Sequence, residues 1–506
     1  MEHQKSLTLW DFLANRGRSF SHEIAVHTSS ASLSFRELFS LADSLARALA
    51  NAGVRDTDIV ALCLPNTLCF VPCVLALARL RTTIALLSPK YAQNELEAIG
   101  HGVRPAFLLA HATLARDSGQ HLKPRKTELL GTSPILEDLA LTTLNAPDAE
   151  RPGRRSLTAP TTDHPALIKF TSGSTAGPKA IALSAANLLS EARTIVNTLH
   201  YSPTDRVLAI VPVCHSYGFD LGVLGTLASG ATLVLQDSFV PRRVLTDISA
   251  LGITIFLGVP SMYRFLVDTA VNTRPDFSSI RYLLSCTAPL SPDLITAFHR
   301  RFRTPISQHY GTSETGAVST HVPTEVLSRP ESVGVAMRDV VVDIVDSDGH
   351  SLPVGTEGEI VVTSHAVAGG YLMGQPLGSS PFKGDACYWT GDRGLIDGDG
   401  FIYVRGRMDD LINVGGFKVS PYEVVQTLQR DPRVREAAVI GVKDSMGETI
   451  VYAAVTLSGA ATETELLSVC RAQLADYKVP RRIRICAELP RGPSGKIRLQ
   501  PDDVAL

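Results

Sequence analysis

The chain has 506 residues, of which 44% are hydrophobic, and this predicts large buried cores divided among more than one domain. A net charge of −2 and an isoelectric point of about 6.7 leave no basic field, so the composition excludes proteins that hold nucleic acid electrostatically. The first residues, Met-Glu-His-Gln-Lys, are not followed by an apolar signal segment, and we expect a cytoplasmic protein.

An uncharged run from Ile59 to Ala78 is long enough to span a bilayer, but Pro65 and Pro72 interrupt it. We therefore expect a buried strand over Ile59–Leu64, a turn and a helix instead of a membrane span. The eight cysteines lie scattered in mostly apolar surroundings without a Cys-x2-Cys pair, which predicts buried free thiols in a reducing compartment.

The middle of the chain alternates between short β-branched or leucine-rich runs and helical stretches. The runs predict strands at Val207–Val211, Ala231–Leu235, Thr254–Leu257 and Tyr282–Leu284. The stretches predict helices at Asn187–Leu199, Val244–Leu251 and Asp293–Phe302. Such alternation favours an α/β, multidomain architecture with largely parallel sheets.

The pattern of strand, turn and helix signals changes twice in the rest of the chain. Residues 333–404 carry short strands with Gly/Asp turns, which predicts a β-rich subdomain at the end of an N-terminal domain of residues 1–404. Residues 405–410 form a charged junction. Residues 411–506 have their own helix and strand signals, and this length suffices for a small α+β domain.

The stretch Lys169–Lys179 is the most informative part of the sequence. It packs hydroxyls, small residues and a lysine into a loop that directly follows the apolar run Ala166–Phe170. Backbone N–H groups, Ser/Thr hydroxyls and an ammonium can surround a polyphosphate. The Walker A spacing is absent, and a flexible turn is the alternative interpretation of this segment alone.

Four further motifs follow in order: Tyr310–Gly316, Tyr388–Asp392, Arg405–Asp410 and Pro493–Ile497. An aromatic residue, small hydroxyl residues and a carboxylate in the first suit a nucleotide and Mg²⁺. The second supplies a carboxylate for ribose hydroxyls. Taken singly, the last three could equally be a turn, a charged linker and a turn with a solvated lysine.

In this order and spacing the five motifs resemble the adenylate-forming superfamily of acyl- and aryl-CoA synthetases, peptide-synthetase adenylation domains and luciferases. The resemblance implies a large N-terminal domain, a mobile C-terminal lid, ATP and Mg²⁺. It also implies two half-reactions: a carboxylate attacks the α-phosphate of ATP to give an acyl-adenylate and pyrophosphate, and a thiol then attacks the acyl carbon and releases AMP.

The resemblance also assigns roles by motif position. Binding of the β- and γ-phosphates is assigned to the loop residues Thr171, Ser172, Gly173, Ser174, Thr175 and Lys179. Tyr310 is expected to stack on adenine, Thr312 to contact the α-phosphate and Glu314 to coordinate Mg²⁺. Asp392 is expected to bind the ribose hydroxyls, with Arg407 nearby. Asp409 is expected to be the hinge. Lys496 is expected to bridge the substrate carboxylate and the α-phosphate in the first half-reaction.

One departure from the superfamily pattern lies in the phosphate loop. Ala176 stands where the superfamily usually has glycine, with Gly177 next to it. If that position requires a positive φ, alanine is disfavoured by roughly 1 kcal/mol or more.

Val211–Phe219 resembles the segment that lines the acyl pocket, with His215 at the gate position. Tyr217 aligns with the aspartate that pairs with the α-ammonium of amino acids in peptide synthetases, and Asp220 lies three residues further on. An α-amino acid substrate is therefore not expected.

His309 precedes Tyr310 where long-chain enzymes tend to have glycine, so we expect it to shorten the acyl tunnel or to offer a polar contact. A packed histidine without a substrate role is the alternative. Ser285 and Ala288 are expected in another wall of the pocket. A compact aryl or short-to-medium acyl acid fits these features best.

The thiol acceptor is expected to approach Gly415, Gly416 and Lys418. The chain ends at Leu506 without a fused carrier module, so we expect free coenzyme A or, as the alternative, the phosphopantetheine of a separate carrier protein. A nucleotide-binding regulator is the non-enzymatic alternative, although such a protein is expected to lose Lys496 or Glu314. Both a monomer and a homodimer stay open.

Overall fold

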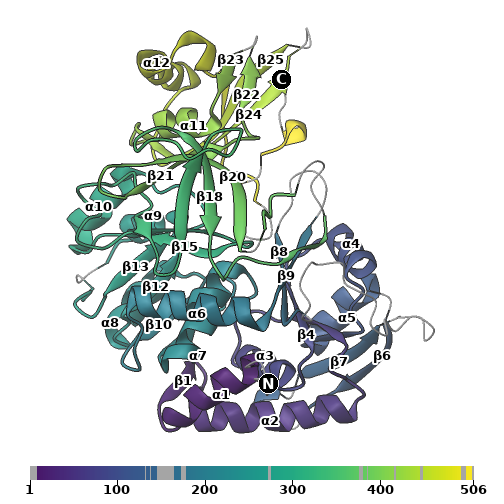
Figure 1. Cartoon of the computed structure of the whole chain (residues 1–506). Coiled ribbons are helices and arrows are strands. Elements are labelled where there is room, and N and C mark those ends of the chain that lie inside the picture. The colour runs from purple at the N-terminus through teal and green to yellow at the C-terminus, as the bar shows by residue number, and fades with distance from the viewer. Residues whose placement is uncertain are drawn as a thin grey trace.

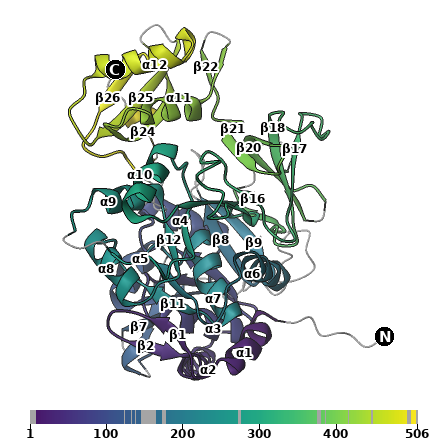
Figure 2. The same ribbon diagram turned by 90° about the vertical axis from the view of Figure 1, so that its left-hand side faces the viewer.

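The computed structural model describes residues 8–122, 124–131, 133–136, 138–144, 165–171, 178–271, 275–374, 380–384, 386–414, 417–444, 448–491, 497 and 499–503. Figures 1 and 2 show a large N-terminal unit and a small C-terminal unit at one end of the molecule. This arrangement agrees with the predicted α/β multidomain class.

The larger sheet has nine strands in the order β16-β15-β14-β13-β12-β10-β11-β1-β2. Their bounds in that order are Val335–Ala336, Gly316–Thr320, Ser307–Thr312, Tyr282–Ser285, Ile255–Gly258, Arg206–Ala209, Thr232–Leu235, Ile24–His27 and Ser32–Ser34. The six strands from β14 to β1 run parallel to their neighbours, and the outer strands are antiparallel. The strands predicted between residues 207 and 284 are therefore confirmed to within two residues.

The second sheet has eight strands in the order β19-β9-β8-β4-β3-β5-β7-β6. Their bounds in that order are Gly370–Met373, Lys179–Leu183, Leu167–Thr171, Thr83–Leu87, Ile59–Cys63, Phe107–His111, Leu139–Leu144 and Pro124–Leu129. Only the central strands β8, β4, β3 and β5 are parallel to one another. This sheet is thus half antiparallel, which differs from the largely parallel sheets predicted.

The described residues contain twelve α-helices, of which α1 to α10 belong to the large unit and α11 and α12 to the small unit. They are α1 (Leu9–Ser19), α2 (Phe35–Asn51), α3 (Phe70–Arg79), α4 (Gln93–Gly102), α5 (Ala112–His121), α6 (Ala185–Leu199), α7 (Gly225–Ser229), α8 (Pro241–Ala250), α9 (Pro260–Asp268), α10 (Pro292–Phe302), α11 (Pro421–Gln429) and α12 (Glu463–Gln473). A π-helix spans Gly218–Leu224, and 3₁₀ turns span Pro134–Leu136, Asp476–Lys478 and Pro501–Asp503.

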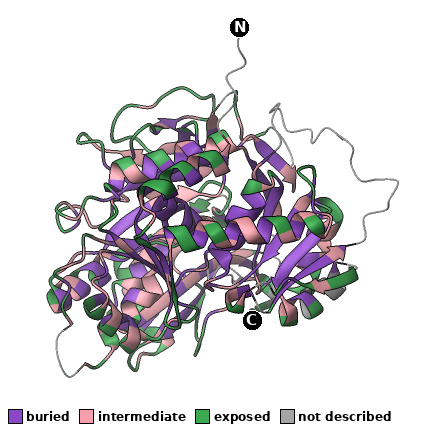
Figure 3. Ribbon diagram, turned by 90° about the horizontal axis from the view of Figure 1, so that it is seen from below, coloured by how far each residue is buried: buried purple, intermediate pink, exposed green. Residues whose placement is uncertain are grey.

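Helix α2 illustrates why these segments fold as they do. Ser34 accepts a hydrogen bond from the Glu37 N–H, and the Glu37 carboxylate accepts one from the Ser34 N–H, so the helix starts with a capping box. Leu38, Leu45 and Leu49 form a fully buried stripe on one face. That face joins one hydrophobic core, which includes strands of both sheets (Figure 3).

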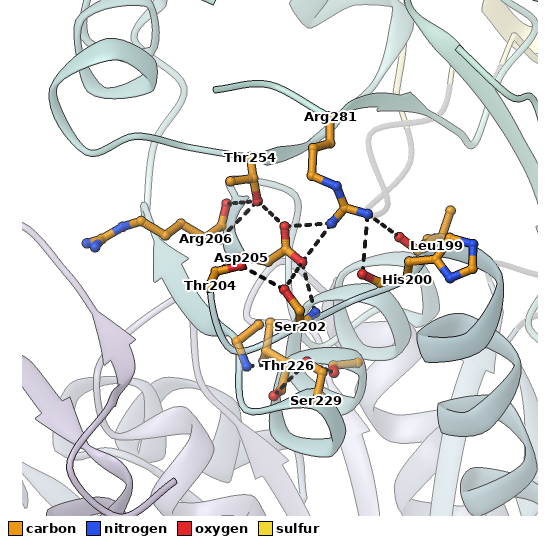
Figure 4. Close-up of polar contacts among 12 residues, drawn as sticks. Leu199, His200, Ser202, Thr204, Asp205, Arg206, Thr226, Ser229, Thr254 and Arg281 are labelled. Atoms are coloured by element: carbon orange, nitrogen blue, oxygen red, sulfur yellow. Dashed lines mark hydrogen bonds and ion pairs between the residues drawn. The ribbon is translucent and has the colours of Figure 1, made fainter. Parts of the chain in front are cut away.

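A buried carboxylate fastens the amino ends of three parallel strands (Figure 4). Asp205 precedes β10, is 1% exposed, and accepts hydrogen bonds from Arg281 Nη1 at 2.7 Å and Thr254 Oγ1 at 2.7 Å. Arg281 precedes β13, and its Nη2 also donates to the Leu199 and His200 carbonyls that end α6. These bonds join the amino ends of β10, β12 and β13 to the carboxyl end of α6.

The β-rich region predicted at 333–404 divides among three sheets. A four-stranded antiparallel sheet contains β17 (Val341–Val345), β18 (Gly358–Thr363), β20 (Cys387–Ile396) and β21 (Ile402–Arg407). In contrast, β16 pairs with β15 and β19 pairs with β9, so two segments of this region complete the large sheets. Backbone pairing between distant segments, and not the local sequence pattern, determines which sheet each of these strands joins.

The small unit folds α11 and α12 against β24 (Val434–Lys443), β25 (Thr449–Leu457) and β26 (Arg482–Ile485), and carries the hairpin β22 (Ile412–Val414) and β23 (Phe417–Val419). It contacts the large unit through Arg435, whose Nη2 lies 3.5 Å from Asp268 Oδ2 and whose guanidinium lies over the Phe265 ring.

The run from Ile59 to Ala78 forms strand β3 and helix α3, as the interrupting prolines predicted. Among the described helices, none combines the length and apolar character needed to cross a bilayer. All eight cysteines are free and six are buried, in agreement with the predicted thiols.

Candidate active site

The motif Tyr310–Gly316 forms a hairpin, because β14 ends at Thr312 and β15 begins at Gly316. Tyr310 and Thr312 therefore belong to the strand, whereas Glu314 lies in the turn. The turn of this hairpin lies at the carboxyl end of β14, which pairs parallel to β13. Open α/β sheets bind ligands at the carboxyl ends of their strands. The Thr312 and Thr315 hydroxyls lie 3.0 Å apart and fix the turn.

Tyr310, Asp392 and Arg407 meet although they come from three different motifs. The Tyr310 hydroxyl donates to Asp392 Oδ2 at 2.6 Å, and Arg407 Nη1 lies 3.4 Å from Asp392 Oδ1. Asp392 is in strand β20 and not in a β-turn, and Arg407 ends the adjacent strand β21. Burial and the Asp392 carboxylate raise the pKa of Tyr310, so its hydroxyl stays protonated at neutral pH.

Glu314 is held by a tyrosine that the sequence did not single out. The Tyr371 hydroxyl donates to Glu314 Oε1 at 2.8 Å and lies 2.9 Å from the Tyr388 hydroxyl. Tyr371 is on β19, and the Lys179 ammonium lies 5.3 Å from the centroid of its ring. Burial and the Glu314 carboxylate raise the pKa of Tyr371, which keeps it a donor. The Glu314 carboxylate is therefore held by one tyrosine hydroxyl, which a second tyrosine hydroxyl contacts in turn.

The phosphate loop is anchored at both ends. Thr171 ends β8, Lys179 begins β9, and the two residues are cross-strand partners. The loop residues Ser172, Gly173, Ser174, Thr175 and Ala176 lie outside the described residues, as do Gly415, Gly416 and Lys496. The roles expected of these residues stay predictions.

The acyl segment passes from a turn into the π-helix Gly218–Leu224, a rare element that recurs at functional sites. The His215 ring lies edge-on to Tyr91, with centroids 6.5 Å apart. The Tyr217 hydroxyl donates to the Leu284 carbonyl at 3.0 Å, and its ring stacks on His309 at 6.0 Å and 24°. Tyr217 therefore belongs to a fixed aromatic pair.

His309 is 6% exposed, and its Nδ1 lies 2.7 Å from the Thr320 hydroxyl of the paired strand. Burial lowers the pKa of His309 to about 4, so the imidazole is neutral at pH 7. A neutral, stacked ring can close an apolar tunnel and still offer one polar atom.

The segment after β13 contains the other expected wall. Ser285 is 2% exposed, and its hydroxyl has no hydrogen-bond partner among the described residues. Thr287 has φ +75°, which is rare for a β-branched residue and typical of strained functional segments. Ala288 is exposed. Of the two predicted wall residues, only Ser285 is therefore buried.

Asn66, in the loop after β3, joins the two sheets at the acyl segment. Its amide donates to the Val211 and Gln236 carbonyls at 3.0 Å, and its Oδ1 accepts from the Val213 N–H at 2.9 Å. No role for Asn66 was predicted from the sequence, because a lone asparagine near Pro65 is typical of an ordinary turn.

The expected hinge and thiol residues lie beyond this cluster. Asp409 accepts a hydrogen bond from Arg407 Nε at 2.8 Å, directly after β21. Lys418 is exposed on β23, where it pairs with Asn413.

Comparison with known proteins gives the family. Residues 13–372 match the AMP-binding enzyme family, and residues 423–496 match the AMP-binding enzyme C-terminal domain. Among curated proteins, a feruloyl-CoA synthase of Amycolatopsis sp is 30% identical, covering 95% of this chain and 96% of the relative. An oxalate–CoA ligase of Arabidopsis thaliana is 29% identical, covering 97% of each.

A solved structure of an anthranilate CoA ligase in complex with anthranoyl-AMP has a TM-score of 0.81 to this chain at 25% identity, covering 97% of this chain and 95% of that one. The family matches extend over both units of the fold, and the structure brings Tyr310, Asp392 and Arg407 into contact. The chain therefore belongs to the AMP-binding enzyme family, within the adenylate-forming superfamily, as an AMP-forming acid–thiol ligase.

Proposed function

We propose that this enzyme activates a compact aryl or short-to-medium acyl acid with ATP and transfers the acyl group to coenzyme A. The observation that carries the acid class is the stack of Tyr217 on His309, because both side chains are buried and the Tyr217 hydroxyl is fixed to a backbone carbonyl. An aromatic pair held in this way limits the depth of the pocket. The relatives that use ferulate and anthranilate support an aryl acid, and the oxalate relative supports a short one.

The residues that meet in the structure suit the first half-reaction. Asp392 can accept hydrogen bonds from ribose hydroxyls, and Tyr310 lies beside it for the adenine. Glu314 would hold Mg²⁺, since this ion is bound by one or two carboxylates together with substrate phosphates, and the Tyr371 hydroxyl fixes the Glu314 carboxylate. Lys496 would bridge the substrate carboxylate and the α-phosphate. The carboxylate is already a nucleophile, so positioning and charge stabilisation supply most of the catalysis.

The second half-reaction would follow a rotation of the small unit about Asp409. The exposed β22–β23 hairpin carries Lys418 and would then face the incoming thiol. Coenzyme A is the favoured acceptor because the curated relatives are CoA ligases. The phosphopantetheine of a separate carrier protein is the alternative.

An acid panel in ATP–pyrophosphate exchange tests this proposal. The panel contains ferulate, anthranilate, benzoate, oxalate, straight-chain acids of 2 to 16 carbons, and the twenty amino acids. We expect the fastest exchange with one aryl or short-to-medium acid. Coenzyme A and a phosphopantetheinylated carrier protein are then supplied with that acid. Fastest exchange with a long-chain or α-amino acid would contradict the proposed acid class, and loading of the carrier alone would contradict coenzyme A.

A further inference from the structure

A buried ion pair lies beneath the site just described. Lys169 Nζ donates to Asp220 Oδ1 at 2.6 Å and to Oδ2 at 2.7 Å, and the two side chains are 3% and 4% exposed. Lys169 lies on β8 and Asp220 lies in the π-helix. The pair therefore joins one strand of the eight-stranded sheet to the segment that follows a strand of the nine-stranded sheet.

Glu191 of α6 adds a third buried titratable group to this cluster. It is 3% exposed, and its Oε1 accepts a hydrogen bond from the Ala317 N–H at 2.8 Å. A Cβ atom at Gly316, which has φ +71°, would lie 2.2 Å from Glu191 Oε2, so the carboxyl fills the space left by that glycine. Burial, with the nearby Asp220 carboxylate, raises the pKa of Glu191 to about 8. Burial also raises the pKa of Asp220, and the Lys169 ammonium opposes that rise.

Each member lies next to a different part of the expected site. Lys169 precedes Thr171 by two residues, and Asp220 follows Tyr217 by three. Glu191 binds the backbone of β15 immediately after the turn that holds Glu314. The three residues therefore lie on the strand that ends at Thr171, in the π-helix that follows Tyr217, and against the strand that follows Glu314, which are distant in sequence.

Stability alone does not account for these charges. Replacing a buried ion pair by apolar residues of similar volume is often neutral or stabilising, because desolvation offsets the Coulomb attraction. What apolar residues cannot supply is direction: two short bonds from one ammonium to both oxygens of one carboxylate fix the relative position of the strand and the helix.

We propose that Lys169, Asp220 and Glu191 are positioning residues that hold strand β8 with its end at Thr171, the acyl segment and the Glu314 hairpin in one mutual arrangement. This inference rests on the proposed function, because it takes the loop from Thr171 to Lys179 as the site of the β- and γ-phosphates. The ion pair sets the position of the Thr171 end of β8, and Glu191 sets the hairpin.

The test measures binding of two nucleotides in the presence of Mg²⁺ by calorimetry. α,β-Methylene-ATP carries the β- and γ-phosphates, and AMP lacks them. In the double variant Lys169→Met/Asp220→Leu, which keeps the volume and removes both charges, we expect Kd for α,β-methylene-ATP to rise at least tenfold. Kd for AMP is expected to stay within twofold and the melting temperature within a few degrees. A general loosening of the fold would weaken both nucleotides equally.

The matched control is Asp205→Leu/Arg281→Met, which removes the ion pair at the amino ends of the strands. This control is expected to lower the melting temperature and to leave both Kd values unchanged. Should the first double variant not fold, Glu191→Leu is the second test: it removes the acceptor of the Ala317 N–H, and Kd for both nucleotides is expected to rise at least fivefold, with Glu191→Gln restoring it.

The inference would be overturned if the double variant bound both nucleotides with the same Kd values as the wild-type protein. Where Glu191→Leu replaces the double variant, unchanged Kd values in Glu191→Leu would overturn it in the same way. Equal weakening of both nucleotides in the double variant would overturn it as well. Absence of α,β-methylene-ATP binding by the wild-type protein would instead contradict the proposed function.

Discussion

The two edges of the nine-stranded sheet hold buried charges in different ways. At the amino edge, Asp205 is enclosed by bonds from Arg281, Thr254 and the Ser202 N–H, all within one compact set of strand ends (Figure 4). At the carboxyl edge, Asp392 of the four-stranded sheet accepts a hydrogen bond from Tyr310 of the nine-stranded sheet, and Glu314 accepts one from Tyr371 of the eight-stranded sheet.

This difference distinguishes a carboxylate that stabilises the fold from carboxylates that are placed to act in the reaction. The partners of Asp205 precede or end regular elements, so that carboxylate fastens the scaffold. The carboxylates at the other edge meet residues of different sheets and lie where strands β13 and β14 end, so a nucleotide can be placed between the elements that they join. Substitutions at the amino edge should therefore change unfolding, and substitutions at the carboxyl edge should change rates.

Lys496→Ala should give the largest change in rate. Adenylation is expected to fall by about 10²–10³-fold, since a preorganised charge at a developing anion contributes roughly 3–4 kcal/mol. Thioester formation from a supplied acyl-adenylate should be nearly unchanged, because the lid then presents another face. Separate assays of the two half-reactions measure this, and equal losses in both would contradict the role of Lys496.

Asp205→Ala should give the largest change in stability. It removes a buried acceptor and leaves Arg281 and Thr254 without it, so the free energy of unfolding is expected to fall by about 3 kcal/mol. Urea denaturation followed by fluorescence measures the loss. The KM for ATP of the folded variant is expected to match the wild type, and a raised KM would mean that the amino edge also shapes the site.

Asp409→Pro tests how the small unit completes the carboxyl edge. Proline fixes φ near −65° and lacks the N–H, so it should trap one lid orientation. We expect adenylation to persist and thioester formation to fall at least tenfold. Stopped-time assays of each step decide this. Proportional loss in both, with an intact circular dichroism spectrum, would indicate that one lid position serves both steps.

His309→Gly should give the smallest effect on rate and the clearest effect on specificity. Removing the ring that stacks on Tyr217 lengthens the pocket, so longer acids are expected to be accepted while the KM for ATP stays nearly constant. His309→Asn, which keeps a side chain at this position, is the control. An unchanged acid profile, or selective loss of ATP binding, would remove His309 from the acyl pocket.

The sequence identified the superfamily because each motif is a local run whose residue types are dictated by the group that it binds. The same locality allowed the strand and helix predictions, since a buried parallel strand such as β12 shows its burial in its own composition. The expectation that Tyr217 leaves an amino acid substrate without a counter-ion stays a prediction; Asp220, three residues further on, forms an ion pair with Lys169.

Local pattern could not reveal contacts made between segments. Tyr371 reaches Glu314 only because β19 pairs with β9, and the region around β19 gives the signal of a separate β-rich subdomain. Lys169 offered one clue, a lysine within an apolar strand, but its partner lies 51 residues away in the chain.

What the sequence determined by itself is therefore the chemistry that each motif can perform and the class of the fold. What only the tertiary structure decided is which motifs share a contact: Tyr310 with Asp392, Tyr217 with His309, and Lys169 with Asp220. The physical reason is that composition and periodicity report how a residue is buried, whereas the identity of its neighbour depends on how the whole chain packs.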